Sequence, residues 1–166
     1  MGLQKLQCRM TMTTNDKVEL FLRILKMVEE RKGREAVQSY MSGNCGNLYY
    51  MLKKVFPQAE AYGMWNSLEN KICRHIITKI DGNFYDIKGV REIKDPSKIK
   101  PVTKEDCERN SNNYTLINIV KQRGVTDRMA QNLRHSEKER AILIFEKVNK
   151  VFNQVIKDKE GGKHSV

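Results

Sequence analysis

Three side chains in this sequence could together carry nucleophilic catalysis: Cys45, His75 and Asp86. A cysteine attacks as its thiolate, and a histidine can remove the thiol proton and stabilise the resulting charge. A carboxylate can then orient the imidazole and select its tautomer. The chemistry expected of such a set is acyl transfer at an amide or ester. It requires that the fold bring three separate elements together.

The first of these elements is a helix that begins at the thiol. Cys45 lies in MSGNCGN, residues 41–47, directly before apolar positions at helical spacing that Pro57 ends. This pattern places Cys45 in the first turn of the helix or one residue before it. There the positive end of the helix dipole lowers the pKa of a thiol. The free N–H groups of the first turn could also hold an oxyanion.

The other two residues are expected on a β-hairpin. Residues 72–80 alternate with a period of two, DGN at 81–83 indicates a turn, and residues 84–90 form the return strand. With the turn centred on the Gly-Asn pair, His75 and Asp86 would occupy neighbouring positions, and a one-residue bulge would bring them face to face. Apolar residues on both faces predict that the hairpin is covered on both sides.

The remaining segments are predicted to be mostly helical. Asn15-Asp16 offers a cap for an amphipathic helix that runs to about Arg34, and residues 91–102 read as a connecting loop. In the last third, short helices are expected from Thr103 onward. A capping box at Ser136 and Glu139 predicts a break before the final helix.

Length and these elements predict one α+β domain. The 166 residues suit a single core, over residues 1–157, with the C-terminal helices of about 103–157 packed on it. Residues 158–166 are expected to be a disordered tail.

Composition narrows the classes of protein further. The net charge of +11, from 31 basic and 20 acidic residues, favours an acidic partner or nucleic acid, although interleaved acids also fit a solvated surface. No run of about 18 apolar residues and no signal peptide is present, so we expect no membrane contact and a cytoplasmic location. No nucleotide or metal motif occurs, and we expect no cofactor and no metal. The four cysteines form no CxxC pair and are expected to be free thiols.

The order Cys, His, Asp resembles the core of the papain-like superfamily, and most closely its transglutaminase-like branch. The resemblance covers about residues 38–90, through GNCGN at the start of a helix and HIITKIDGNFYDIKG across the hairpin. It implies a papain-like or transglutaminase-like core in which Cys45 is the nucleophile, His75 the general base and Asp86 the residue that orients it. Two residues are rivals for the side-chain oxyanion donor: Gln38, seven positions before the thiol, and Asn44, next to it.

The leading prediction is therefore a cysteine-dependent hydrolase or acyltransferase, such as a thiol protease or amidase, with an acidic protein or peptide as substrate. The alternative is a non-enzymatic basic protein that binds nucleic acid or an acidic host protein through its C-terminal helices. In composition the short, Lys-rich and Asn-rich chain resembles tailed-phage accessory proteins, which would place it in the host cytoplasm as a modulator of a host factor.

These two classes predict different features of the site. An enzyme requires an exposed Cys45 of low pKa within hydrogen-bond reach of His75. A binding protein requires a contiguous basic face and binding that weakens steeply with salt. In the second class each of the three residues has an ordinary structural role, with the thiol packed as a small apolar group.

Overall fold

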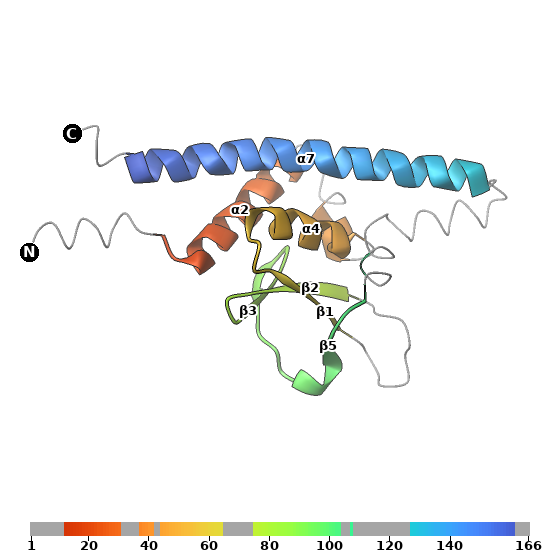
Figure 1. The fold of residues 1–166 in the computed structure, drawn as a ribbon, viewed down its shortest axis with the longest axis horizontal. Coiled ribbons are helices and arrows are strands. Elements are labelled where there is room, and N and C mark those ends of the chain that lie inside the picture. The colour runs from red at the N-terminus through yellow and green to blue at the C-terminus, as the bar shows by residue number, and fades with distance from the viewer. Residues whose placement is uncertain are drawn as a thin grey trace, which may run out of the picture.

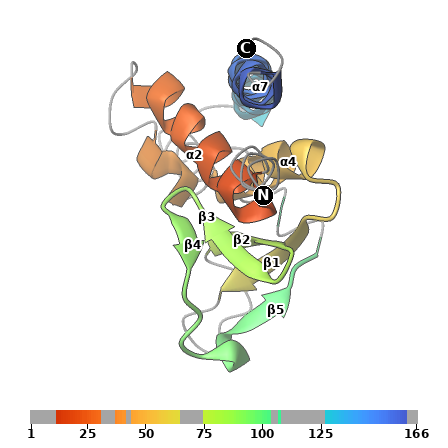
Figure 2. The same ribbon diagram turned by 90° about the vertical axis from the view of Figure 1, so that its left-hand side faces the viewer.

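Helices and strands form three layers in the protein (Figure 1). The computed structural model describes residues 12–30, 37–41, 44–64, 75–103, 107 and 127–161. The helix α7, Asp127–Gly161, lies across a middle layer of α2, Thr14–Glu30, and α4, Cys45–Val55. Below these helices is an antiparallel sheet, and Figure 2, which looks along α7, shows that this helix and the sheet lie on opposite sides of the middle layer. The predicted α+β class is confirmed at this level.

The sheet has five strands in the order β4-β3-β2-β1-β5, and each pair of neighbours is antiparallel. Their bounds are β1 Glu60–Met64, β2 His75–Ile80, β3 Asn83–Asp86, β4 Gly89–Arg91 and β5 Ile99–Pro101. The sequence predicted only the central hairpin of β2 with a return strand. It missed β1, whose five residues include a glycine, and β5, which is three residues long, ends in proline and falls in the expected loop.

The hairpin that carries the candidate residues turns one residue earlier than predicted. Ile80 pairs with Asn83, so the turn consists of Asp81 and Gly82, with φ of 48° and 86°. Positive φ at both residues is the backbone of a type I′ turn, which matches the twist of the flanking strands. The register is regular from Thr78↔Tyr85 to Ile80↔Asn83.

The helix α2 starts with a reciprocal cap. The Oγ1 atom of Thr13 accepts the backbone N–H of Asp16 at 3.1 Å, and the Asp16 carboxylate accepts the N–H of Thr13 at 3.4 Å. Of the predicted pair Asn15-Asp16, Asp16 takes part in this cap, with Thr13 as its partner. The side chain of Asn15 instead accepts the hydroxyl of Tyr85 at 2.6 Å and joins the start of α2 to β3.

The apolar core lies between the three layers. It combines one face of α2, the inner face of α4, part of the sheet and a stripe on α7, where Ile144, Val148 and Phe152 are buried. The helix α7 runs without interruption through the position where Ser136 predicted a break, and that prediction is wrong. The helix also includes the first four residues of the expected tail. The short helices expected after Thr103 fall almost wholly outside the described residues.

Candidate functional site

Cys45 is the first residue of α4, as the sequence predicted. The preceding residue, Asn44, is held on both sides. Its N–H donates to the carbonyl of Ser39 at 3.0 Å, and its own carbonyl accepts the N–H of Asn47 at 3.1 Å. The side-chain oxygen of Asn44 also accepts the amide group of Asn47. The start of α4, and with it the backbone of Cys45, is thus fixed by local hydrogen bonds.

The sulfur of Cys45 receives a backbone hydrogen bond from the sheet. Its Sγ atom accepts the N–H of Ile76, in β2, at 3.2 Å. A donor aimed at the sulfur favours the thiolate, as does the positive end of the helix dipole. Both effects act in the direction that nucleophilic chemistry requires.

The thiol is nevertheless buried, with Cys45 only 1% exposed. It packs with Ile76 under the partly buried side chains of Tyr49, Ala61 and Val102. The exposed thiol that the enzyme interpretation requires is therefore not seen in this structure. The reason is that α4 packs directly on β1 and β2, so its first residue is covered by the sheet below and by Tyr49 one turn later.

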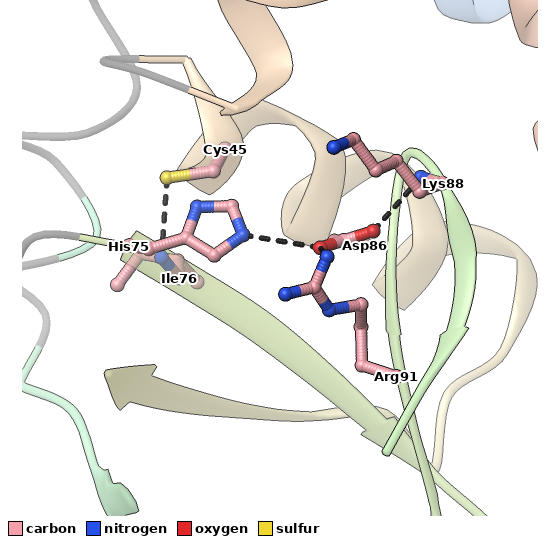
Figure 3. Close-up of polar contacts among 6 residues, drawn as sticks. All are labelled: Cys45, His75, Ile76, Asp86, Lys88 and Arg91. Atoms are coloured by element: carbon pink, nitrogen blue, oxygen red, sulfur yellow. Dashed lines mark hydrogen bonds and ion pairs between the residues drawn. The ribbon is translucent and has the colours of Figure 1, made fainter. Parts of the chain in front are cut away.

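His75 and Asp86 are joined side chain to side chain. Nε2 of His75, the first residue of β2, lies 3.3 Å from Oδ2 of Asp86, the last residue of β3. Extension of the hairpin register would place Asp86 opposite Ile77, so His75 is its diagonal neighbour, within the reach of a long side chain. The predicted bulge is not needed. Figure 3 shows the imidazole between the sulfur of Cys45 and the carboxylate of Asp86, with Nδ1 on the side of Cys45.

Asp86 accepts donors on both carboxylate oxygens (Figure 3). Oδ1 accepts the backbone N–H of Lys88 at 2.8 Å, and a guanidinium nitrogen of Arg91 lies 3.3 Å from Oδ2. The side chain of Asp86 is fully buried, which by itself raises the pKa of the carboxyl group. The hydrogen bonds from His75 and Lys88 and the charge of Arg91 outweigh this effect and hold the pKa of Asp86 below its usual value.

The two rival oxyanion donors differ in position. Asn44 is half-buried and adjacent to the thiol in the chain, whereas Gln38 is exposed, ahead of the 3-10 turn η1, Ser39–Met41. The structure thus brings Cys45, His75 and Asp86 together, with Asn44 beside them. Gln38 is exposed and precedes Ser39, whose carbonyl accepts the N–H of Asn44.

Two contributors were missed by the sequence interpretation: the N–H of Ile76 and the guanidinium of Arg91. A backbone donor has no signature in residue type. Arg91 reaches Asp86 only because the chain reverses between β3 and β4, a turn that the sequence pattern did not separate from the return strand. An Asp followed five residues later by an Arg is only a weak signal of such a pair.

Other site types find no support in the residues that the structure describes. Within them, no three histidine, cysteine or acidic side chains are grouped so that they could hold a metal ion. None of the described helices combines the length and the apolar character needed to cross a membrane. Cys45 and Cys107, the two described cysteines, are both free thiols.

Fold and site together define an α+β protein with a thiol at a helix start beside a histidine–carboxylate pair. Comparison with protein families matches residues 21–121 to the phage YunG-like protein family. The match spans more than half of the chain, including all of the candidate residues, and the protein belongs to this family. Searches of curated proteins and of solved structures found no match. The expectation of a phage protein is confirmed, while the comparisons show no papain-like or transglutaminase-like family.

Proposed function

We propose that this protein is a cysteine-dependent hydrolase or acyltransferase in which Cys45, His75 and Asp86 act as nucleophile, base and orienting residue. The observation that carries the proposal is the arrangement of the imidazole. His75 is held by a buried carboxylate at 3.3 Å and lies beside a thiol at the start of a helix. This is the geometry that thiol activation uses, and it agrees with the transglutaminase-like resemblance of residues 38–90.

The proposed reaction passes through an acyl-enzyme. His75 takes the proton of Cys45, and the sulfur attacks the substrate carbonyl carbon, so that a C–S bond forms while the C=O π electrons move to oxygen. The N–H of Cys45 and the side chain of Asn44 are the proposed donors to that oxyanion. The oxyanion collapses, and the amine or alcohol leaves with the proton of the imidazolium. Water or an acceptor amine then attacks the thioester, gives its proton to His75 and releases the acyl group from Cys45.

Burial of the thiol restricts how a substrate reaches it. The side chain of His75 is 13% exposed, so the imidazole marks the solvent side of the pair. Tyr49 and Val102, which pack against Cys45, are themselves only partly buried, and Tyr49 also packs against the main apolar core. Movement of Val102, which packs against Cys45, would disturb the main core less than movement of Tyr49, which packs against both. We expect a short extended acyl substrate, and the charge of +11 favours an acidic peptide or protein.

Acylation by an activated ester tests this function. The full chain is mixed with p-nitrophenyl acetate, p-nitrophenolate release is followed, and the acylated residue is located by mass spectrometry. We expect a burst, an acetyl group on Cys45 and slow turnover. The variant His75→Ala should lose at least about 100-fold in the acylation rate. Equal rates in the two proteins, or acetylation of other residues only, would overturn the proposal.

The second candidate is a non-enzymatic basic protein that binds nucleic acid or an acidic host protein, as a modulator of a host factor. The observation that favours it is the 1% exposure of Cys45. A buried sulfur that accepts the N–H of Ile76 is also what a purely structural cysteine, joining α4 to β2, would show. In that case polyanion binding should fall steeply between 50 and 200 mM salt, by about 10-fold or more. Chemical inertness of Cys45 together with such binding would select this candidate.

A further inference from the structure

Two side chains share one oxygen of the buried carboxylate at the candidate site. Nε2 of His75 and a guanidinium nitrogen of Arg91 each lie 3.3 Å from Oδ2 of Asp86, and the other oxygen accepts the N–H of Lys88. The carboxylate therefore has donors from three residues on its two oxygens, and Figure 3 shows Arg91 approaching it from a different side than His75. This arrangement leaves the carboxyl group little freedom to rotate.

Arg91 supplies the permanent positive charge in this group. Lys88 contributes its backbone N–H to Asp86, and His75 is charged only when protonated. A general base must alternate between the neutral and the protonated state, whereas the residue that orients it must stay ionised in both. Besides the hydrogen bond from Lys88, a fixed cation helps a carboxylate without exposure to remain ionised while its histidine is neutral.

The β3–β4 turn places this cation. Asp86 pairs with Gly89, and Arg91, at the end of β4, pairs with Phe84. The hydrogen bond from Lys88 to Asp86 closes the same turn, so the carboxylate organises the reversal that returns the guanidinium to it. The side chain of Arg91 is one-third exposed, which is lower than a free surface arginine and consistent with a fixed position.

We propose that Arg91 is a positioning residue for the thiol–imidazole pair: it keeps Asp86 ionised and aimed at His75 and so sets the pH range in which Cys45 reacts. The inference rests on the proposed cysteine chemistry and adds a fourth member to it. Arg91 itself is not expected to touch the substrate. Removal of its charge makes the site more negative, which disfavours a further negative charge on the sulfur.

The test uses the full chain with Cys8, Cys73 and Cys107 replaced by serine, so that iodoacetamide reports on Cys45 alone. The alkylation rate is measured against pH for this parent and for Arg91→Met, Arg91→Lys and the control Lys100→Met, which removes the same charge from an exposed position on β5. We expect the midpoint of the Arg91→Met profile to rise by at least about half a pH unit. The midpoint of Lys100→Met should equal that of the parent. Because Arg91→Lys keeps the positive charge, its midpoint should lie close to that of the parent.

The outcomes separate this inference from the function on which it rests. A lowered midpoint in the parent that Arg91→Met leaves in place overturns the role of Arg91 but not the cysteine chemistry. An ordinary midpoint in the parent, near 8.5, overturns both. Circular dichroism of each variant shows whether it is folded. If Arg91→Met does not fold, Arg91→Gln replaces it: a midpoint raised above that of the parent supports the role of Arg91, and a parental midpoint overturns it.

Discussion

His75 and Asp86 meet diagonally across a hairpin: Nε2 and Oδ2 are 3.3 Å apart although the register places Asp86 opposite Ile77. A diagonal pair leaves the imidazole extended along β2 and not straight across the hairpin. That direction puts the ring between Asp86 and Cys45, as Figure 3 shows. The regular register of a tight two-residue turn therefore accounts for the relative position of two of the three candidate residues.

Asp86 should make the stability of the fold sensitive to acid. Because the pKa of Asp86 is below its usual value of 3.8 in the folded state, its contribution is complete above about pH 4 and is lost as the pH falls through the folded-state pKa. We expect the free energy of unfolding, measured by urea titration, to decline below pH 4 less steeply in Asp86→Asn than in the native protein. The variant should also be about 1–3 kcal/mol less stable at pH 7, because His75 and the partly exposed Arg91 lose their charged partner.

The control for this measurement is Asp158→Asn, which changes an exposed carboxyl group near the end of α7. Its pH dependence should follow that of the native protein. Identical acid profiles for Asp86→Asn and the native protein would show that Asp86 is not the group that links stability to pH.

Glu29 is a buried carboxylate that joins α2 to the segment before the candidate site. It is 2% exposed, and its Oε1 accepts the hydroxyl of Tyr40 at 3.2 Å, while Arg140 of α7 lies 3.9 Å from Oε2. Tyr40→Phe should cost about 1–3 kcal/mol in chemical denaturation, because a buried acceptor loses its donor. Tyr62→Phe removes an exposed hydroxyl that donates to Glu60 and should change stability by less than about 0.5 kcal/mol. Equal effects of the two changes would contradict a structural role for Glu29.

Alanine substitutions at two glycines with positive φ distinguish the cost of backbone strain from the cost of steric crowding. Gly82 has φ of 86° and open space where a Cβ atom would stand, whereas Gly89 has φ of 106° and would bring a Cβ atom within 3.2 Å of Glu19. Gly82→Ala should cost about 1–2 kcal/mol in urea denaturation from conformation alone. Gly89→Ala should cost more, since the Glu19 side chain must also shift from its contact with the N–H of Val90. A smaller loss at Gly89 would disprove the close approach of α2 to β4.

The packing of α7 can be tested with two neighbouring residues. Phe152 is 4% exposed and contacts the rings of Phe21 and Phe56, whereas Val151 is 45% exposed. Phe152→Ala should cost about 3–5 kcal/mol of unfolding free energy, and Val151→Ala less than about 0.5 kcal/mol. A single cooperative transition is expected in both. Two transitions, or no loss at Phe152, would mean that α7 is not part of the main core.

Sequence patterns predicted the elements whose signals are local. The helix start at Cys45 follows from a glycine- and asparagine-rich segment before an apolar repeat, and the hairpin follows from an alternating strand and a turn signal. The contacts that complete the site are not local. The packing of α4 on β2 brings the N–H of Ile76 to the sulfur and places Tyr49 against the thiol. The turn before β4 returns Arg91 to Asp86. Neither arrangement can be predicted from residue types alone.

The same distinction explains the errors elsewhere. Edge strands as short as β5 gain most of their stability from pairing with β1 and show little pattern of their own. The expected break at Ser136 rested on a capping motif, but a Ser and a Glu are tolerated inside a helix when the apolar stripe continues beyond them. Burial of Cys45 was missed because a thiol suits a reactive site and a packed one equally well.

Activation of Cys45 by His75 should be visible in the pH dependence of thiol alkylation. Iodoacetamide modification of Cys45, located by mass spectrometry, is compared between the native protein and His75→Ala. If His75 activates Cys45, the alkylation midpoint lies clearly below the value of about 8.5 for a free thiol and rises towards that value in His75→Ala. A Cys45 that does not react, or an ordinary midpoint that is the same in both proteins, would contradict it.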